Sequence, residues 1–157
     1  MVFKILTSSL GIIMGSIAFP VFTFLFFNFH AGLWALLSII QASMVLHLHL
    51  LYRSYRLETW HTPHSLSACR DLGLLTMIGG LAGTVYYIYT AVTNQVLLDY
   101  CHTVCDFFII LQEPMFPIHD SSVIAAVWAF MSVKWGAGLA FFGQKYKLVI
   151  DREYSLL

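Results

Sequence analysis

Residues 5–52 constrain this chain most strongly, because no Asp, Glu, Lys or Arg occurs anywhere between them. A helix that crosses a bilayer needs about 20 apolar residues, so two such helices and a short turn fit into this stretch. Asn28, His30 and Gly32 mark the turn, since polar residues and glycine favour bends. Pro20 lies within the first of the two helices, and we expect it to kink that helix.

The composition extends the same conclusion to the whole chain. Of its 157 residues, 59% are hydrophobic and 10% are charged, whereas about a quarter of the residues in a soluble domain are charged. A small domain leaves much of its surface exposed, so this apolar surface must face lipid. We predict an all-α membrane protein with a single transmembrane domain over 1–157. Its four transmembrane helices are expected over 5–27, 33–52, 72–92 and 121–143.

The basic residues predict how the chain is oriented. All of them except Lys134 precede the first helix or lie in the 53–71 loop or in the 144–157 tail. The 93–120 segment contains acidic residues but no Lys or Arg. Loops rich in Lys and Arg stay on the cytosolic side of a membrane. We therefore expect cytosolic N and C termini, a cytosolic 53–71 loop and an outer 93–120 loop.

Cys101 and Cys105 flank His102 in the expected outer loop. A local disulfide is the first interpretation, because that side is oxidising for a surface or endosomal protein. A Cys/His metal site stays open as an alternative, although it needs further ligands at a defined spacing. We expect His61 and His64, in the cytosolic loop, to bind metal weakly at most.

Two kinds of ionisable residue lie inside the expected helices. Lys134 is roughly 20 Å along the last helix at about 1.5 Å per residue, where a lysine costs about 3 kcal/mol. We expect its side chain to be buried and to meet an anion, a water cavity or a ligand; a groove to interfacial water is the alternative. His47 and His49 point about 200° apart on a helix, so only one can face the bundle, and we favour a functional role for His49.

Several classes of function are excluded by what the chain lacks. No phosphate-binding loop and no nucleophile elbow occurs in the sequence, so we expect no enzymatic activity. The formal net charge is zero, so nothing points to nucleic acid as a partner. Transport and scaffolding remain.

The last helix carries a resemblance to a known family. Residues 127–135 read Val-Trp-Ala-Phe-Met-Ser-Val-Lys-Trp, and residues 142–146 read Phe-Gly-Gln-Lys-Tyr. This pattern resembles the heme-responsive-gene (HRG) family of small eukaryotic heme transporters, in which an aromatic–Ala–basic–basic–Tyr motif follows a similar helix. His49 and Tyr52, followed by Trp60, resemble the family's second helix. The chain departs from the family at Gly143 and Gln144, and the second change removes a positive charge.

The resemblance implies a four-helix transporter that moves heme toward the cytosol, with heme as its transported ligand and a homo-oligomer as its assembly. The residues that it implies for heme binding are His49, a histidine of the outer loop, Phe142, Lys145 and Tyr146. For the outer loop we choose His119 first and His102 second, and we add Lys134 as a cation inside the last helix. Histidine and tyrosine are known heme-iron ligands, which assigns the iron to His49, His119 and Tyr146. Heme propionates are anions that the two lysines would pair with.

Two other functions stay open on the sequence. A non-transporting four-helix membrane scaffold would account for the topology, the glycine-rich third helix and the cysteine loop. A carrier of protons or metal ions would account for the histidines. The C-terminal Tyr-Ser-Leu-Leu of residues 154–157 resembles a sorting signal, so we expect a multi-pass protein of the plasma membrane, the endosome–lysosome membrane or both.

Overall fold

The computed structural model describes residues 2–93 and 121–154, and the described chain is helical apart from short turns. In chain order its elements are α1 (Val2–Pro20), the π-helical turn η1 (Val21–Leu25), α2 (Phe29–Arg53), α3 (Leu57–Trp60), α4 (Pro63–Thr93) and α6 (Ser122–Tyr154). Four segments are long and apolar enough to cross a membrane: α1 with η1, α2, α4, and α6. The described residues contain no strand. The prediction of an all-α protein with four membrane-spanning helices is confirmed.

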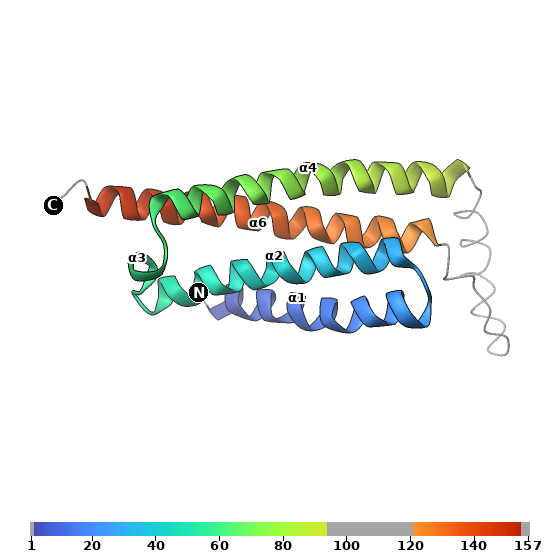
Figure 1. The fold of residues 1–157 in the computed structure, drawn as a ribbon, viewed down its shortest axis with the longest axis horizontal. Coiled ribbons are helices and arrows are strands. Elements are labelled where there is room, and N and C mark those ends of the chain that lie inside the picture. Colours follow the sequence, from blue (N-terminus) through green and yellow to red (C-terminus); the bar gives the residue numbers. More distant parts are fainter. Residues whose placement is uncertain (1, 94–120, 155–157) are drawn as a thin grey trace.

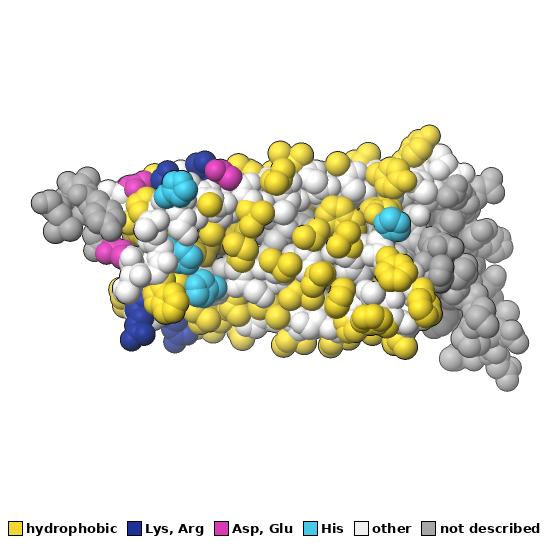
Figure 2. All heavy atoms as spheres, viewed as in Figure 1, with side chains coloured by type: hydrophobic (Ala, Val, Ile, Leu, Met, Phe, Trp, Pro, Cys, Tyr) yellow, Lys and Arg dark blue, Asp and Glu magenta, His cyan; other side chains and the backbone are white. Residues whose placement is uncertain are grey.

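The long helices run side by side, with α4 against α6, α6 against α2 and α2 against α1 (Figure 1). Both ends of the chain lie at the same end of the bundle. On the face drawn in Figure 2, charged side chains gather at that end, whereas hydrophobic side chains cover the middle. This distribution fits a bundle whose middle lies in lipid and whose charged end lies in water. That this end is cytosolic remains a prediction.

The two long helices in the second half of the chain are longer than predicted. α4 begins at Pro63 instead of residue 72, so the expected 53–71 loop contains α3 and the first turns of α4. The signal was present: Thr62 accepts a hydrogen bond from the Ser65 amide at 3.2 Å, and proline is favoured at the first helical position. α6 continues to Tyr154, so most of the expected 144–157 tail is helical.

The turn between the first two helices includes Asn28, as predicted, but it ends earlier than predicted, because His30 and Gly32 belong to the first turn of α2. After Pro20 the helix widens, and the Phe26 amide donates to the Val21 carbonyl, five residues back, at 3.1 Å. Asn28 then begins α2, because its side-chain oxygen accepts a hydrogen bond from the Ala31 amide at 3.0 Å. An asparagine at this position satisfies an amide that the helix itself leaves unpaired.

Glycines bring α4 and α6 into backbone contact. A Cβ atom added to Gly73 would lie 2.5 Å from the Ala140 nitrogen and 2.7 Å from the Gly136 oxygen. A Cβ on Gly136 would in turn lie 2.9 Å from the Gly73 oxygen. Small residues at helix contacts let backbones approach closely in membranes. By contrast, a Cβ on Gly79 would meet nothing within 4 Å.

The two glycine environments give a matched test of this packing. We expect Gly73→Ala to destabilise the protein by about 1–3 kcal/mol, because the added methyl group must push backbone away from backbone. Gly79→Ala is the control on the same helix. It should leave the unfolding temperature in detergent unchanged or raise it slightly, since alanine favours helix over glycine. Equal unfolding temperatures for the two variants would contradict the close contact.

Candidate functional site

A buried His–Tyr pair joins α2 to α6 toward the end of the bundle that carries the termini. His49 is 2% exposed and Tyr146 is 3% exposed. The Nδ1 atom of His49 lies 2.8 Å from the Tyr146 hydroxyl, within hydrogen-bonding distance. A polar group in the apolar interior of a membrane protein must find a partner inside the protein. Each of these side chains is therefore the hydrogen-bond partner that offsets the cost of burying the other.

Aromatic rings and one cation surround this pair. The Phe142 ring lies 4.4 Å from the His49 ring, between centroids, and is nearly perpendicular to it. Tyr52 stacks on Tyr146 at 4.6 Å with 20° between the ring planes. The Lys4 Nζ atom, from the first turn of α1, lies 4.6 Å from the centroid of Phe142. We call these five residues the inner cluster.

The spacing of the residues explains why the inner cluster forms. His49 and Tyr52 are three residues apart on α2, and Phe142 and Tyr146 are four apart on α6, so each pair shares one helix face. His47 points away from this face and is exposed. The expectation that only one of His47 and His49 faces the bundle is confirmed.

The structure brings together only part of the residue set implied by the family resemblance. His49, Phe142 and Tyr146 meet in the inner cluster. Lys145 is exposed on α6, beside but not within the cluster. The implied His102 and His119 lie outside the described residues, as do Cys101 and Cys105 of the predicted disulfide.

The expected burial of Lys134 is wrong. Its side chain is exposed on α6, and its Nζ atom lies 5.0 Å from the ring centroid of its neighbour Trp135. Trp135 is the buried residue of the two, and it packs against Gly11 of α1. Lys134 instead shares its outward direction with Phe141, one heptad further along α6 and also exposed. The cation therefore lies on the exposed surface of α6.

A series of buried polar groups follows the α2–α6 interface from one end of the bundle to the other. The Asn28 side chain donates to the Ser121 carbonyl at 3.3 Å, and the hydroxyls of Ser38 and Ser132 lie 3.0 Å apart. The His49–Tyr146 pair comes last. Polar residues inside a membrane protein are costly and usually mark a pathway.

Gln41 belongs to the same interface and is not among the predicted site residues. It is 2% exposed, and neither its amide nitrogen nor its amide oxygen has a hydrogen-bond partner among the described residues. Its position eight residues before His49 places it about 12 Å further from the inner cluster. A glutamine in the centre of an apolar span was the signal that could have identified it.

Two further histidines meet outside the bundle core. The rings of His47 and His61 lie 5.5 Å apart between centroids, and His61 Nδ1 lies 3.0 Å from the Ser65 hydroxyl. Burial, and to a smaller extent the charge of His47, lowers the pKa of His61. No group of three or more His, Cys, Asp or Glu residues suited to a metal ion occurs in 2–93 and 121–154. That His61 and His64 bind metal weakly at most remains a prediction.

Fold and site together define a small helical membrane protein with a histidine–tyrosine pair enclosed by aromatic rings between its two central helices. The chain is similar to a protein named "Heme transporter hrg-1" from Caenorhabditis elegans. The two are 26% identical over 148 residues, which cover 94% of this chain and 69% of the relative. No protein-family model and no solved structure matches the chain.

The His49–Tyr146 hydrogen bond can be tested through stability. We expect Tyr146→Phe to destabilise the protein by about 1–3 kcal/mol, because it leaves a buried ring nitrogen of His49 without its partner. Tyr55→Phe is the control, since Tyr55 is 97% exposed. Thermal unfolding of both variants in detergent measures the difference. An unchanged midpoint for Tyr146→Phe would show that the hydrogen bond contributes nothing.

Gln41 gives a prediction of the opposite sign. A buried amide without a partner costs about 1–3 kcal/mol, and leucine has a similar size without that cost. We therefore expect Gln41→Leu to raise the unfolding temperature of the purified protein. A lower unfolding temperature would show that the amide is hydrogen-bonded in the protein, for example to water.

Proposed function

We propose that this protein transports heme across a membrane toward the cytosol. The similarity to a protein named as a heme transporter, over almost the whole chain, supports this proposal. The observation that carries it is the buried polar series along the α2–α6 interface, which ends at a histidine–tyrosine pair. Both side-chain types ligate heme iron, and the surrounding rings of Phe142 and Tyr52 suit an apolar macrocycle.

In this proposal the inner cluster is the last site before release. A cavity of about 490 Å³ lies next to it, with Tyr52 and Arg53 of α2 and Ile150 of α6 in its wall. Tyr52 thus lines the cavity and also stacks on Tyr146. Iron held by His49 and Tyr146 would leave through this cavity, where Arg53 offers a cation to a propionate.

Cations near the cluster are the proposed partners of the heme propionates. Lys4 lies against Phe142, and Lys145 neighbours Tyr146 in the sequence. Gln144, which replaces a basic residue of the family motif, accepts a hydrogen bond from Arg70 of α4 at 3.1 Å. We propose that Arg70 supplies at this position the charge that the motif has lost.

Other assignments rest on the same proposal. Lys134 would meet heme at the lipid-facing surface of α6, midway through the membrane. His119 or His102 would bind heme on the outer side. The charge distribution supports cytosolic termini, and we propose a homo-oligomer in the plasma membrane or the endosome–lysosome membrane.

The proposed function can be tested with purified protein and hemin. We expect the wild-type protein to shift the Soret band of hemin, and His49→Ala to reduce the amplitude of this shift. In a heme-auxotrophic cell that takes up heme through this protein, His49→Ala should lower heme-dependent growth to background. Loss of His49 as an iron ligand would prevent heme binding at the inner cluster, which is the last site before release.

His47→Ala is the matched control, because His47 is on the same helix but is exposed on another face. It should leave both the hemin spectrum and growth unchanged. A wild-type protein that neither shifts the Soret band nor supports growth would contradict heme transport and favour a non-transporting scaffold.

A further inference from the structure

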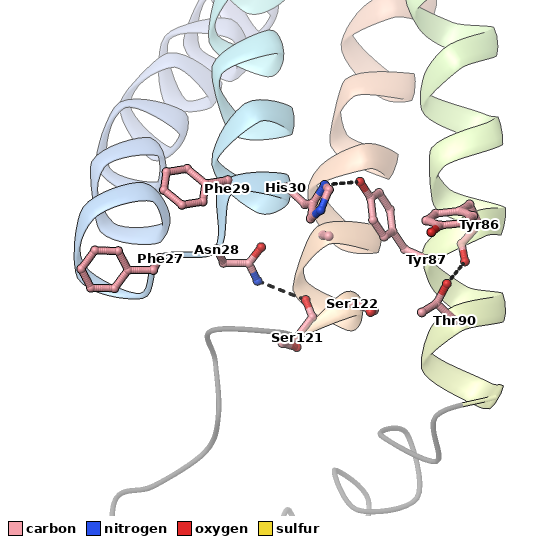
Figure 3. Close-up of a pocket in the computed structure, with 10 residues that line it drawn as sticks. Phe27, Asn28, Phe29, His30, Tyr86, Tyr87, Thr90, Ser121 and Ser122 are labelled. Atoms are coloured by element: carbon pink, nitrogen blue, oxygen red, sulfur yellow. Dashed lines mark hydrogen bonds between the residues drawn. The ribbon is translucent and has the colours of Figure 1, made fainter.

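The end of the bundle opposite the termini contains a cavity of about 380 Å³ that the sequence reading did not anticipate. It lies between the start of α2, the C-terminal part of α4 and the start of α6, as Figure 3 shows. Sites for small molecules have volumes of about 300–1,000 Å³. Exposed aromatic side chains contribute to its wall, among them Phe29 and Tyr86. Its size and its rings fit a flat, apolar ligand.

A hydrogen-bonded chain of three side chains fixes a histidine in this cavity. The His30 Nδ1 atom lies 3.1 Å from the Tyr87 hydroxyl, and Figure 3 shows the two side chains pointing toward each other. The Trp34 indole N–H donates to the same hydroxyl at 3.4 Å. His30 and Tyr86 remain exposed, so a ligand can reach them without rearrangement of the helices.

The geometry of this chain leaves one ring nitrogen of His30 for a ligand. An indole nitrogen only donates, so Trp34 occupies one lone pair of the Tyr87 oxygen. The Tyr87 hydroxyl can then donate its own proton to Nδ1 of His30, or accept a hydrogen bond from an Nδ1–H through its second lone pair, according to the tautomer of the ring. In the second tautomer the ring proton is on Nδ1 and Nε2 carries a bare lone pair. Metal-binding histidines commonly use this arrangement, in which the second nitrogen donates to a fixed acceptor.

The position of Trp34 depends on a glycine of α4. A Cβ atom on Gly83 would lie 2.6 Å from Cζ2 of Trp34. The absence of a side chain at Gly83 lets the indole ring rest against α4, one helical turn before Tyr87. The sequence thus builds a support for His30 from two helices.

The charge of the wall distinguishes between kinds of ligand. No Lys or Arg is among the described residues that line the cavity, so it offers no cation to a phosphate or to an isolated carboxylate. Its wall combines aromatic faces and one histidine with the polar side chains of Asn28, Thr90, Ser121 and Ser122. A metalloporphyrin matches the aromatic faces and the histidine, with its carboxylates turned toward water.

We propose that this cavity is an outer docking site for an iron porphyrin, with His30 Nε2 as an axial ligand and Tyr87 as the residue that positions it. The proposal rests on the proposed transport of heme and places the first binding step on described residues, whichever histidine of segment 94–120 also takes part. It makes His30 and His49 the ligands of two separate sites at opposite ends of α2.

The test uses the full-length purified protein titrated with hemin in a His49→Ala background, where the inner site is impaired. We expect a residual Soret shift that adding His30→Ala abolishes. Tyr87→Phe should weaken the residual binding about tenfold, the usual scale for loss of a residue that orients a ligand. His30→Tyr should restore binding with a displaced Soret band, because a tyrosine oxygen also ligates heme iron.

His64→Ala is the control, since His64 is an exposed histidine at the start of α4, far from this cavity. It should leave the residual band unchanged. A residual band that His30→Ala does not alter, or a His49→Ala variant that binds no hemin, would overturn the outer site and leave heme transport standing. Failure of the wild-type protein to bind hemin would instead overturn the proposed function itself.

Discussion

The contact between α2 and α6 is the interaction on which the rest of the structure depends. Lipid provides no hydrogen-bond partners, so polar side chains in a membrane span must pair inside the protein. Ser38 pairs with Ser132, and His49 pairs with Tyr146. The two pairs are separated by 11 residues on α2 and by 14 on α6, and together they hold the register of the two helices. α1 and α4 then pack on the outside of this central pair, α4 through the glycines that it shares with α6.

The sequence was sufficient for the number of spans, for a turn at Asn28 and for the opposite directions of His47 and His49, because each depends on local pattern. It was insufficient for Lys134, and the reason is physical. In a soluble protein the buried face of a helix is the apolar one. In lipid both faces are apolar, so the polarity of the side chains no longer shows which face is buried. Phe141 is exposed and Phe142 packs on His49, and nothing in their types distinguishes them. For Lys4 the sequence predicts only orientation, because its contact with Phe142 joins residues from opposite ends of the chain.

The two histidine–tyrosine pairs at opposite ends of α2 have similar chemistry and different exposure. His30 and Tyr87 open onto a cavity, whereas His49 and Tyr146 are buried and occupy each other. A ligand could therefore reach the His30–Tyr87 pair in the observed arrangement, and it could reach the His49–Tyr146 pair only if α2 and α6 moved apart. A ligand shifts such an equilibrium only by as much as it binds one arrangement better than the other. The amide of Gln41, which has no hydrogen-bond partner among residues 2–93 and 121–154, lies between the two pairs. A separation of α2 from α6 would give it access to water or to the ligand.

The hydrogen bond of the inner pair also bears on how tightly heme could be held there. Heme whose iron binds to the Tyr146 oxygen or to the His49 Nδ1 atom must first replace the 2.8 Å contact between these two atoms. Breaking that contact without replacing it costs about 1–3 kcal/mol in a buried site, and the stacking of Tyr52 on Tyr146 adds to the cost of opening it. The free energy needed to open the pair reduces the observed binding free energy of heme by the same amount. A transporter must release what it binds, and a pair of iron ligands that re-form their own hydrogen bond after the ligand departs favours that release.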